Sequence, residues 1–337
     1  FGFKLVNLIL HIVNGVLIFI LCIQLYLQFN AEKAKAYVFA LLAAGLWLLH
    51  PIQVNTVMYT VQRMTELSAF FCLLGFITYL HGRSLMAKGR LSAGLVWVFI
   101  SVYGCTSLAV LGKENGILLP LFLMILELTL ISGKQGYYIA IRTVWIMLLL
   151  PIMLSLLYLG LTANSLAANF IIRDFTPGER VLTEFTVLIN YLKVILFPHP
   201  GAFSLYHDGY QISRSLFTPP FTLISILITG GLLSVSILWR KKYPLAAAGI
   251  LIFFAGHLLE AGPFSLDLYY EHRNYLPSLG VMIVISWAGT SLLTSKNLKI
   301  PVVIFLGIYS LSLMAITRDQ AWLWSEPELQ LNQWVKH

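Results

Sequence analysis

Charged residues are scarce in this chain of 337 residues. They make up 11 % of it, whereas a soluble domain carries about 25 %. Hydrophobic residues make up 58 %, and apolar runs of about 18 residues or more, the length at which a helix can cross a bilayer, recur along the chain. The composition therefore excludes an ordinary soluble domain and predicts an all-α polytopic membrane protein.

Cysteine is also rare, and its three positions exclude two further classes. Cys22, Cys72 and Cys105 all lie in apolar segments, where a disulfide framework or a cysteine metal cluster is not expected. An initiator methionine and a basic segment before the first apolar run are absent too, so we expect the chain to begin inside a larger protein. The formal net charge of +8 does not indicate nucleic-acid binding, because the basic residues fall in the connections between apolar runs.

What the chain does contain is a series of long apolar segments. Each is long enough to cross about 30 Å of hydrocarbon as a helix. We predict ten membrane-spanning helices, at residues 4–29, 36–50, 65–81, 91–111, 115–131, 140–161, 220–239, 244–260, 276–293 and 299–317. The expected organisation is one transmembrane domain over 1–317, followed by a tail at 318–337.

Charge alternates between successive connections. Twelve of the 22 basic residues fall in five connections that contain only Glu32 and Glu127 as acids; these basic residues are Lys33, Lys35, Arg83, Lys88, Arg90, Lys134, Arg142, Arg240, Lys241, Lys242, Lys296 and Lys299. The other side holds ten basic and twelve acidic residues. The positive-inside rule places the basic connections in the cytoplasm, so both ends of the chain are expected to face outward.

The long outward segment, 162–219, has its own pattern. Thr176, Pro177 and Glu179 predict a helix start with a capping box. Polar residues then recur along one face, so the helix near 178–197 is expected to lie in the outer interface and not to span the membrane. The turn-rich, aromatic stretch that follows is expected to form an ordered loop over a cavity.

Polar and ionisable residues are concentrated at the outward ends of the apolar segments. They are His50, Gln53, Arg63 and Glu66; Lys113 and Glu114; His257 and Glu260; and Glu271, His272 and Arg273. A charge near the bilayer centre costs about 2.5–3.5 kcal/mol on insertion scales, so such residues are functional candidates. Two alternatives remain open: Arg63 pairs locally with Glu66, and Arg273 extends to the interface among neighbouring tyrosines.

Four stretches together resemble one family. They are FGFKLVNLILHIVNG, HPIQVNTVMYTVQRMTELSAFFCLLGFITYLHGR, GKENGILLPLFLMILEL and HLLEAGPFSLDLYYEHRNYLPSLG. They resemble the transmembrane-and-tetratricopeptide-repeat O-mannosyltransferases and their bacterial relatives, which have the GT-C fold. The resemblance implies a GT-C-like bundle, a polyprenyl-phosphate sugar donor and a hydroxyl acceptor, usually on protein. It also implies action on the outer face of a bacterial inner membrane.

The same resemblance locates some functional parts outside this sequence. The family's catalytic acid lies in the first outward loop, which would be upstream of Phe1. Its tetratricopeptide repeats, a surface for partner proteins, would follow the tail at 318–337. The catalytic base therefore stays unassigned.

For the donor, the chemistry of the remaining residues suggests a phosphate site. We expect Arg63, Lys113 and Arg273 to converge on the lipid phosphate, because arginine and lysine suit phosphate oxygens. Glu66, Glu114 and Glu271 are expected to offset the repulsion between these cations. His50, Glu66, Glu260, Glu271 and His272 are candidates to orient the cations, bind the acceptor or hold a divalent metal, and Gln53, Glu114 and His257 are candidates for support or acceptor binding.

Two other function classes were weighed against the enzyme. A non-catalytic membrane scaffold or accessory subunit would keep the fold and hold partner proteins. A transporter or lipid flippase is less favoured, because paired glycine and proline breaks at mid-membrane are not apparent in the two halves.

Overall fold

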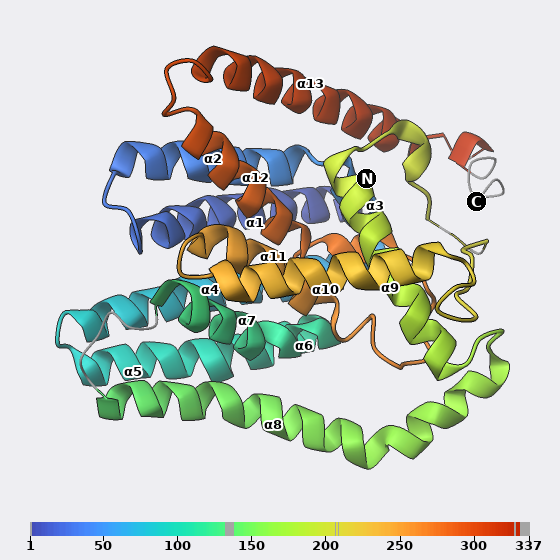
Figure 1. Cartoon of the computed structure of the whole chain (residues 1–337), viewed down its shortest axis with the longest axis horizontal. Helices are drawn as coiled ribbons and strands as arrows, with labels where there is room; N and C mark the ends of the chain where they lie inside the picture. The colour runs from blue at the N-terminus through green and yellow to red at the C-terminus, as the bar shows by residue number, and fades with distance from the viewer. Residues whose placement is uncertain (1, 132–137, 206, 208, 327, 331–337) are drawn as a thin grey trace.

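The computed structural model describes residues 2–131, 138–205, 207, 209–326 and 328–330 (Figure 1). All the regular elements in this described part of the chain are helices, as the apolar runs predict. In hydrocarbon, backbone N–H and C=O groups find no water, and a helix satisfies them within its own segment. The predicted all-α class is therefore confirmed.

Ten helical segments correspond to the ten predicted spans. They are α1 (Gly2–Leu27), α2 (Lys33–Leu49), α4 (Arg63–Ala87), the continuous α5 (Leu91–Phe99), η3 (Ile100–Cys105) and α6 (Thr106–Gly112), the continuous η4 (Glu114–Leu118), α7 (Leu119–Leu126) and η5 (Glu127–Ile131), then α8 (Tyr138–Ala168), α10 (Phe221–Trp239), α11 (Pro244–His257), α12 (Ser278–Leu292) and α13 (Lys299–Leu323). The other helical elements lie in the connections between them: the 20-residue α9 (Pro177–Leu196) and the short pieces η1 (Pro51–Gln53), α3 (Val54–Met58), η2 (Thr60–Gln62), η6 (Asn169–Ile172), η7 (Pro200–Ala202) and η8 (Glu271–Asn274).

Not all ten segments are long enough to cross a membrane alone. Seven helices are long and apolar enough, and an eighth span forms if α2 is counted with the segment Pro51–Met58, which bends away from it by 52°. Helices α11 and α12 have 14 and 15 residues, about 21–23 Å of helix, which is less than the hydrocarbon thickness of about 30 Å. Seven of the predicted spans are thus supported by length and composition.

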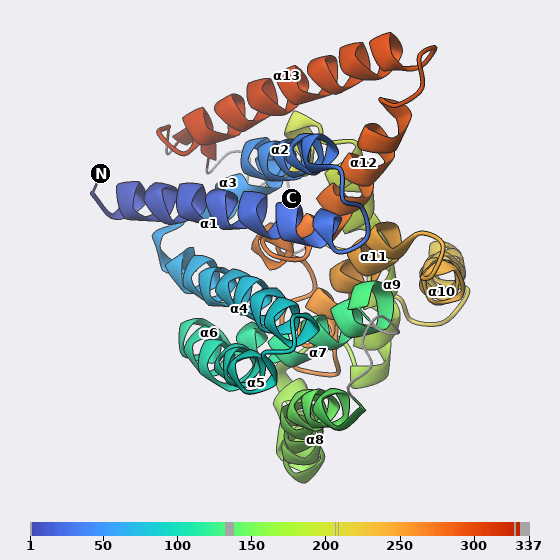
Figure 2. The same ribbon diagram turned by 90° about the vertical axis from the view of Figure 1, so that its left-hand side faces the viewer.

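Three of the long apolar helices lie at the outside of the bundle. Figure 2 shows α8, α10 and α13 at its periphery, around α4, α7 and α11. Only 11 % of the most apolar stretch of α8 and of α13 is buried inside the protein. Side chains such as Leu161 and Phe305 are exposed there. Exposed apolar surface of this extent is suited to lipid, and the protein is a multi-pass membrane protein.

Glycine pairs allow two of the inner crossings to be close. A Cβ atom added to Gly249 of α11 would meet the carbonyl oxygen of Gly280 in α12 at 2.4 Å. Gly82 of α4 and Gly94 of α5 approach each other in the same way, at 2.8 Å. Small residues at such crossings let helix backbones pack closely where hydrophobic association is weak.

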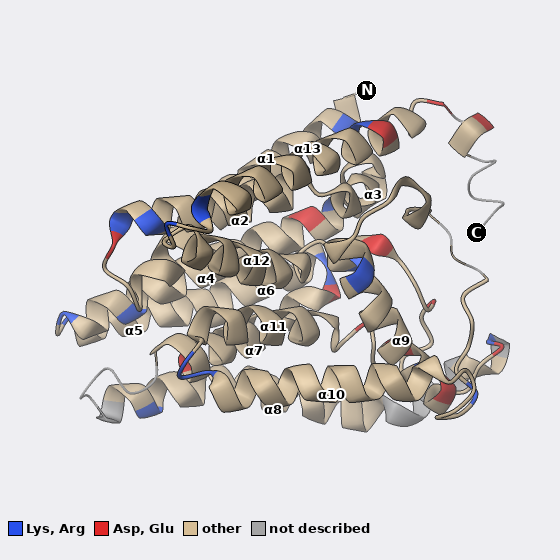
Figure 3. Cartoon of the chain, turned by 45° about the horizontal axis from the view of Figure 1, so that its top comes forward, with Lys and Arg blue, Asp and Glu red and all other residues tan. Residues whose placement is uncertain are grey.

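The two ends of the bundle differ in charge. The connections 27–33, 87–91, 239–244 and 292–299 lie at one end, which carries lysine and arginine (Figure 3). The start of α1 and the end of α13 lie at the opposite end, here called the termini end. This arrangement matches the predicted alternation of connections; Lys134 lies outside the described residues. Which end faces the cytoplasm stays a prediction.

Helix α9 crosses the termini end of the bundle. It begins with the predicted capping box: the Thr176 side chain accepts from the Glu179 N–H, and the Glu179 carboxylate accepts from the Thr176 N–H. It is not among the helices suited to span a membrane. Figure 1 shows α9 running across the direction of α8, α10 and α13, as expected of an interfacial helix.

Candidate functional site

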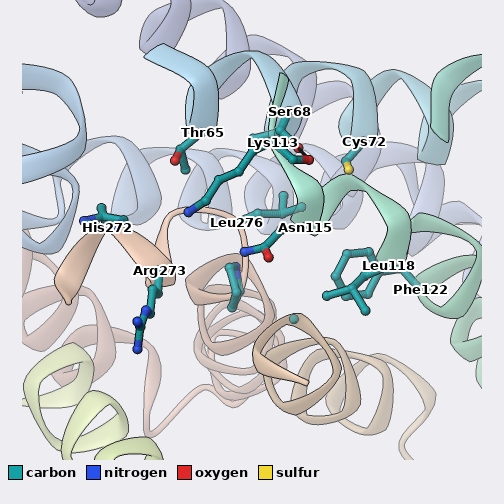
Figure 4. Close-up of a pocket in the computed structure, with 13 residues that line it drawn as sticks. Thr65, Ser68, Cys72, Lys113, Asn115, Leu118, Phe122, His272, Arg273 and Leu276 are labelled. Atoms are coloured by element: carbon teal, nitrogen blue, oxygen red, sulfur yellow. Dashed lines mark hydrogen bonds between the residues drawn. The ribbon is translucent and has the colours of Figure 1, made fainter. Parts of the chain in front are cut away.

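Two cavities lie at the termini end, and the first contains two of the predicted cations. This inner pocket has a volume of about 30 Å³, and its polar lining includes Thr65, Ser68, Lys113, Asn115, His272 and Arg273. Its other wall is apolar and includes Cys72, Leu118, Phe122 and Leu276. Figure 4 shows the Lys113 side chain extending toward His272, with the Arg273 guanidinium farther away. The space holds about two water molecules.

Lys113 reaches the pocket because the chain is extended at this residue. Its φ of −156° and ψ of 148° separate α6 from η4, so its side chain leaves the bundle axis. The Lys113 Nζ lies 2.9 Å from Glu260 Oε1, and both side chains are nearly buried. Lys113 therefore joins the α6–η4 break to the connection that follows α11.

Arg273 continues this contact into a longer chain of charges. Its Nε lies 3.6 Å from Glu260 Oε2, and its Nη1 lies 3.9 Å from Glu184 Oε1 of α9. Glu184 in turn lies 2.9 Å from Arg180 Nη2. The five alternating residues, Lys113, Glu260, Arg273, Glu184 and Arg180, form what we call the buried ion chain.

The two arginines are also anchored by backbone carbonyls. Arg273 donates to the carbonyls of Asp267 at 2.7 Å and Leu268 at 3.0 Å. Arg180 donates to those of Gly262 at 3.1 Å and Leu266 at 2.7 Å. These carbonyls lie in the irregular connection after α11, where helix bonds are unavailable to them. The arginines thus order this connection, and the connection fixes their positions.

The ion chain sets the charge states around the inner pocket. Burial alone would raise the pKa of Glu260, but the charges of Lys113 and Arg273 outweigh it and lower this pKa to about 2. Burial raises the pKa of Glu184 to about 7, against the effect of Arg180 and Arg273. Burial also lowers the pKa of His272 to about 3, with Lys113 adding to the effect. His272 is therefore neutral near pH 7.

The ion chain has an excess of positive charge. It contains three cations and two carboxylates, so one positive charge remains even when Glu184 is ionised. Removing ions from water is costly unless their charges are compensated. A monoanion entering the inner pocket would complete that compensation. The pocket can therefore accept an anionic group whose apolar continuation lies along its apolar wall.

Arg63 does not join the other two cations, and this part of the predicted convergence is wrong. Its Nε donates to Asn7 Oδ1 at 2.9 Å and its Nη2 donates to the Phe3 carbonyl at 2.9 Å. It therefore ties α4 to α1 and does not line the inner pocket. Glu66 is buried, and neither of its carboxylate oxygens has a hydrogen-bond partner in the described chain.

The carboxylates that compensate the cations also differ from the expected ones. Glu260 and Glu184 lie beside Lys113 and Arg273, whereas we had expected Glu114 and Glu271. Glu114 is exposed at the start of η4. The difference arises because each cation pairs with a carboxylate on another element and not with one close to it in sequence.

Three other candidates make structural contacts. His50 Nε2 donates to the Ile195 carbonyl at 2.9 Å while its Nδ1 accepts from the Ile52 N–H, so the ring is neutral. The Gln53 amide donates to Ser278 Oγ at 3.1 Å. His257 is buried and its Nδ1 lies 2.8 Å from the Phe253 carbonyl, one turn earlier in α11. His50 and Gln53 thus tie the end of α2 and η1 to α9 and α12, whereas the contact of His257 lies within α11.

Glu271 faces away from the inner pocket, toward a second cavity. Its carboxylate accepts from the Ser204 N–H at 3.0 Å and from the Asn55 amide at 3.2 Å, and it lies 2.6 Å from His207 Nε2. His207 lines this second cavity, here called the outer cavity, which has a volume of about 180 Å³. Helix η8 therefore places His272 and Arg273 in the lining of the inner pocket and Glu271 against His207, which lines the outer cavity.

Sequence reasoning did not identify several residues that build the site. Arg180, Glu184 and His207 were not candidates, although Arg180 and Glu184 lie off the polar face of an amphipathic helix, which was a usable signal. A second missed group is centred on Tyr275, whose hydroxyl lies 3.0 Å from His11 Nδ1 and accepts from the Asn14 amide at 3.1 Å. Both partners belong to the first motif of the family resemblance.

Metal binding has no clear support in the geometry. In the parts of the chain that the structure describes, no group of three or more histidine, cysteine, aspartate or glutamate side chains is arranged to hold a metal ion.

Comparison with known proteins gives a partial match. The chain is 31 % identical over 121 residues to the human protein O-mannosyl-transferase TMTC4. The match covers 34 % of this chain and 16 % of that relative. No protein-family model and no solved structure matches. The chain is thus similar, over about a third of its length, to a protein O-mannosyl-transferase.

Proposed function

We propose that this protein is a membrane glycosyltransferase of the GT-C type that takes a sugar from a polyprenyl-phosphate donor. The acceptor is a hydroxyl group, most simply on a protein, and the reaction takes place on the outer face of a bacterial plasma membrane. The partial similarity to a protein O-mannosyl-transferase supports the reaction class and makes mannose the first sugar to test.

One observation carries the proposal. Lys113 and Arg273 come from distant parts of the chain, flank the same carboxylate of Glu260, and line a pocket with an apolar wall. A polyprenyl phosphate has this combination of one anionic group and a long apolar chain. A scaffold would not require the two cations to meet at a pocket.

These residues would act on the leaving group. The acceptor oxygen attacks C1 of the sugar and its proton passes to a general base. The bond between C1 and the phosphate oxygen breaks, and the phosphate leaves with the electron pair. Fixed positive charge near a developing anion lowers the barrier to such a step. Because the inner pocket holds only about 30 Å³, we infer that the phosphate displaces the Glu260 carboxylate from Lys113 when it binds.

The direct test is substitution of Lys113 in the membrane-embedded protein. We expect Lys113→Ala to weaken binding of a radiolabelled polyprenyl-phosphate mannose about tenfold or more. This factor corresponds to the free energy that a hydrogen bond to a charged group contributes. Lys113→Arg should restore part of the binding, because it restores the charge. Assays with and without EDTA report whether a divalent metal is needed.

The control is Lys296→Ala, which removes an exposed lysine at the basic end. It should bind donor as the unchanged protein does. Equal donor binding by Lys113→Ala, the control and the unchanged protein would refute the phosphate site. A protein that binds donor and transfers no sugar to any acceptor would favour the scaffold.

A further inference from the structure

The outer cavity is built from segments that are distant in sequence. Its polar and aromatic lining consists of Asn190, Lys193, His199, His207, Tyr210 and Tyr269. The first two belong to α9, the next three to the stretch after it, and the last precedes η8. With about 180 Å³ it is smaller than the roughly 300–1,000 Å³ of drug-sized ligand pockets. A single small polar molecule fits it.

The walls of the outer cavity are held by hydrogen bonds. The hydroxyls of Tyr210 and Thr186 lie 3.1 Å apart. The Tyr191 hydroxyl both donates to the carbonyl of Tyr270 and accepts from its N–H, each at 2.9 Å. Glu271 anchors His207. A cavity fixed in this way is largely preformed, so ligand binding needs little ordering of the protein.

The chemistry of the lining selects among small ligands. Amide, imidazole and phenol groups both donate and accept hydrogen bonds, as sugar hydroxyls do. A phosphate oxygen only accepts, and Lys193 is the only lysine or arginine among the described residues of the lining. Tyr210 and Tyr269 stack with ring centroids 5.5 Å apart and form a rigid aromatic part of the lining.

We propose that the outer cavity is a binding site for a single sugar unit. It deepens the proposed function and rests on it, because a sugar unit reaches this face either on the lipid-linked donor or as a glycan on the acceptor. Glu271 holds His207 of this cavity, and the next two residues, His272 and Arg273, line the inner pocket. A sugar here would therefore lie near the segment that carries Arg273.

The test is ligand-observed saturation-transfer NMR on the whole protein in detergent, with methyl glycosides of mannose, glucose, galactose and N-acetylglucosamine as probes. We expect at least one glycoside to bind. His199→Ala and Asn190→Ala should each weaken glycoside binding about two- to tenfold, which corresponds to the free energy of one neutral hydrogen bond. His199 is exposed, so its truncation leaves the fold intact. The matched control is His81→Ala, an exposed histidine on α4 at the basic end.

Competition separates the two sources of sugar. If polyprenyl-phosphate sugar displaces the glycoside from the unchanged protein, the cavity binds the sugar of the donor. If the glycoside stays bound while the donor is bound, the cavity binds a sugar of the acceptor. Lys113→Ala should keep glycoside binding, so failure of the phosphate site does not remove this readout. Three outcomes would overturn the proposal. No glycoside binds, both cavity variants bind the glycoside as well as the control does, or inorganic phosphate displaces the glycoside.

Discussion

Glu184 is the residue in the buried ion chain whose charge changes near neutral pH. Burial raises its pKa to about 7, while Arg180, Arg273 and Glu260 face it from α9, η8 and the end of α11. Protonated Glu184 leaves the chain with two excess positive charges, and ionised Glu184 leaves it with one. Glu260 stays ionised and His272 stays neutral from pH 6 to 8, because their pKa values are about 2 and about 3.

We therefore expect donor affinity to fall as the pH rises from 6 to 8. Ionisation of Glu184 adds a negative charge beside Arg273, and at an effective dielectric constant of about 20 this costs a bound phosphate about 1 kcal/mol, about fivefold in affinity. The measurement is donor binding to membranes at pH 6, 7 and 8. Glu184→Gln should give a flat profile; a slope like that of the unchanged protein would exclude Glu184 as the cause.

The residue types at the site were visible in the sequence, and their pairings were not. Charges at the ends of apolar segments marked Lys113, Glu260 and Arg273, because charges there are costly. Arg63 looked equivalent, but its contacts with Asn7 and Phe3 depend on how α1 crosses α4. Local sequence spacing carries no information about that crossing.

At the level of elements, a second buried charge pair fixes the basic end of the bundle. Arg83 of α4 lies 2.6 Å from Glu127 at the start of η5, and both side chains are buried. The Tyr79 hydroxyl donates to the same carboxylate at 2.7 Å. Two polar groups of α4 therefore depend on one carboxylate in η5.

We expect Glu127→Ala to destabilise the protein by about 3–5 kcal/mol, because it leaves the Arg83 charge buried without its partner. Thermal unfolding in detergent, followed by tryptophan fluorescence, should show a clearly lower midpoint. The control is Glu32→Ala, which removes an exposed partner of Lys35 and should cost about 0–1 kcal/mol. Equal midpoints for the two variants would contradict this role of Glu127.

Elements were easier to predict than the cavities between them. Hydropathy located all ten helical segments, and the sequence from Thr176 to Glu179 located the start of α9. What covers the polar face of α9, however, was not predicted. That face receives the loop that follows: Thr183 accepts from the Ser213 N–H, and Thr186 meets Tyr210. Helical periodicity shows that a face is polar but not what covers it.

For the whole molecule, the remaining question is its orientation in the membrane. The basic connections lie together at one end, and the start of α1 and the end of α13 lie at the other. Lysine and arginine in short connections are retained in the cytoplasm during insertion. The inner pocket and the outer cavity, at the termini end, are then on the outer face.

This orientation is tested by cysteine labelling with a membrane-impermeant reagent on intact cells. Ala87 is exposed at the end of α4, and Gly209 is exposed at the termini end. The natural cysteines, Cys22, Cys72 and Cys105, are buried and should not react, so they need not be removed. We expect Gly209→Cys to be labelled on intact cells and Ala87→Cys only after the membrane is opened. The reverse pattern would place both cavities in the cytoplasm, where a polyprenyl-phosphate sugar presented on the outer face could not reach them.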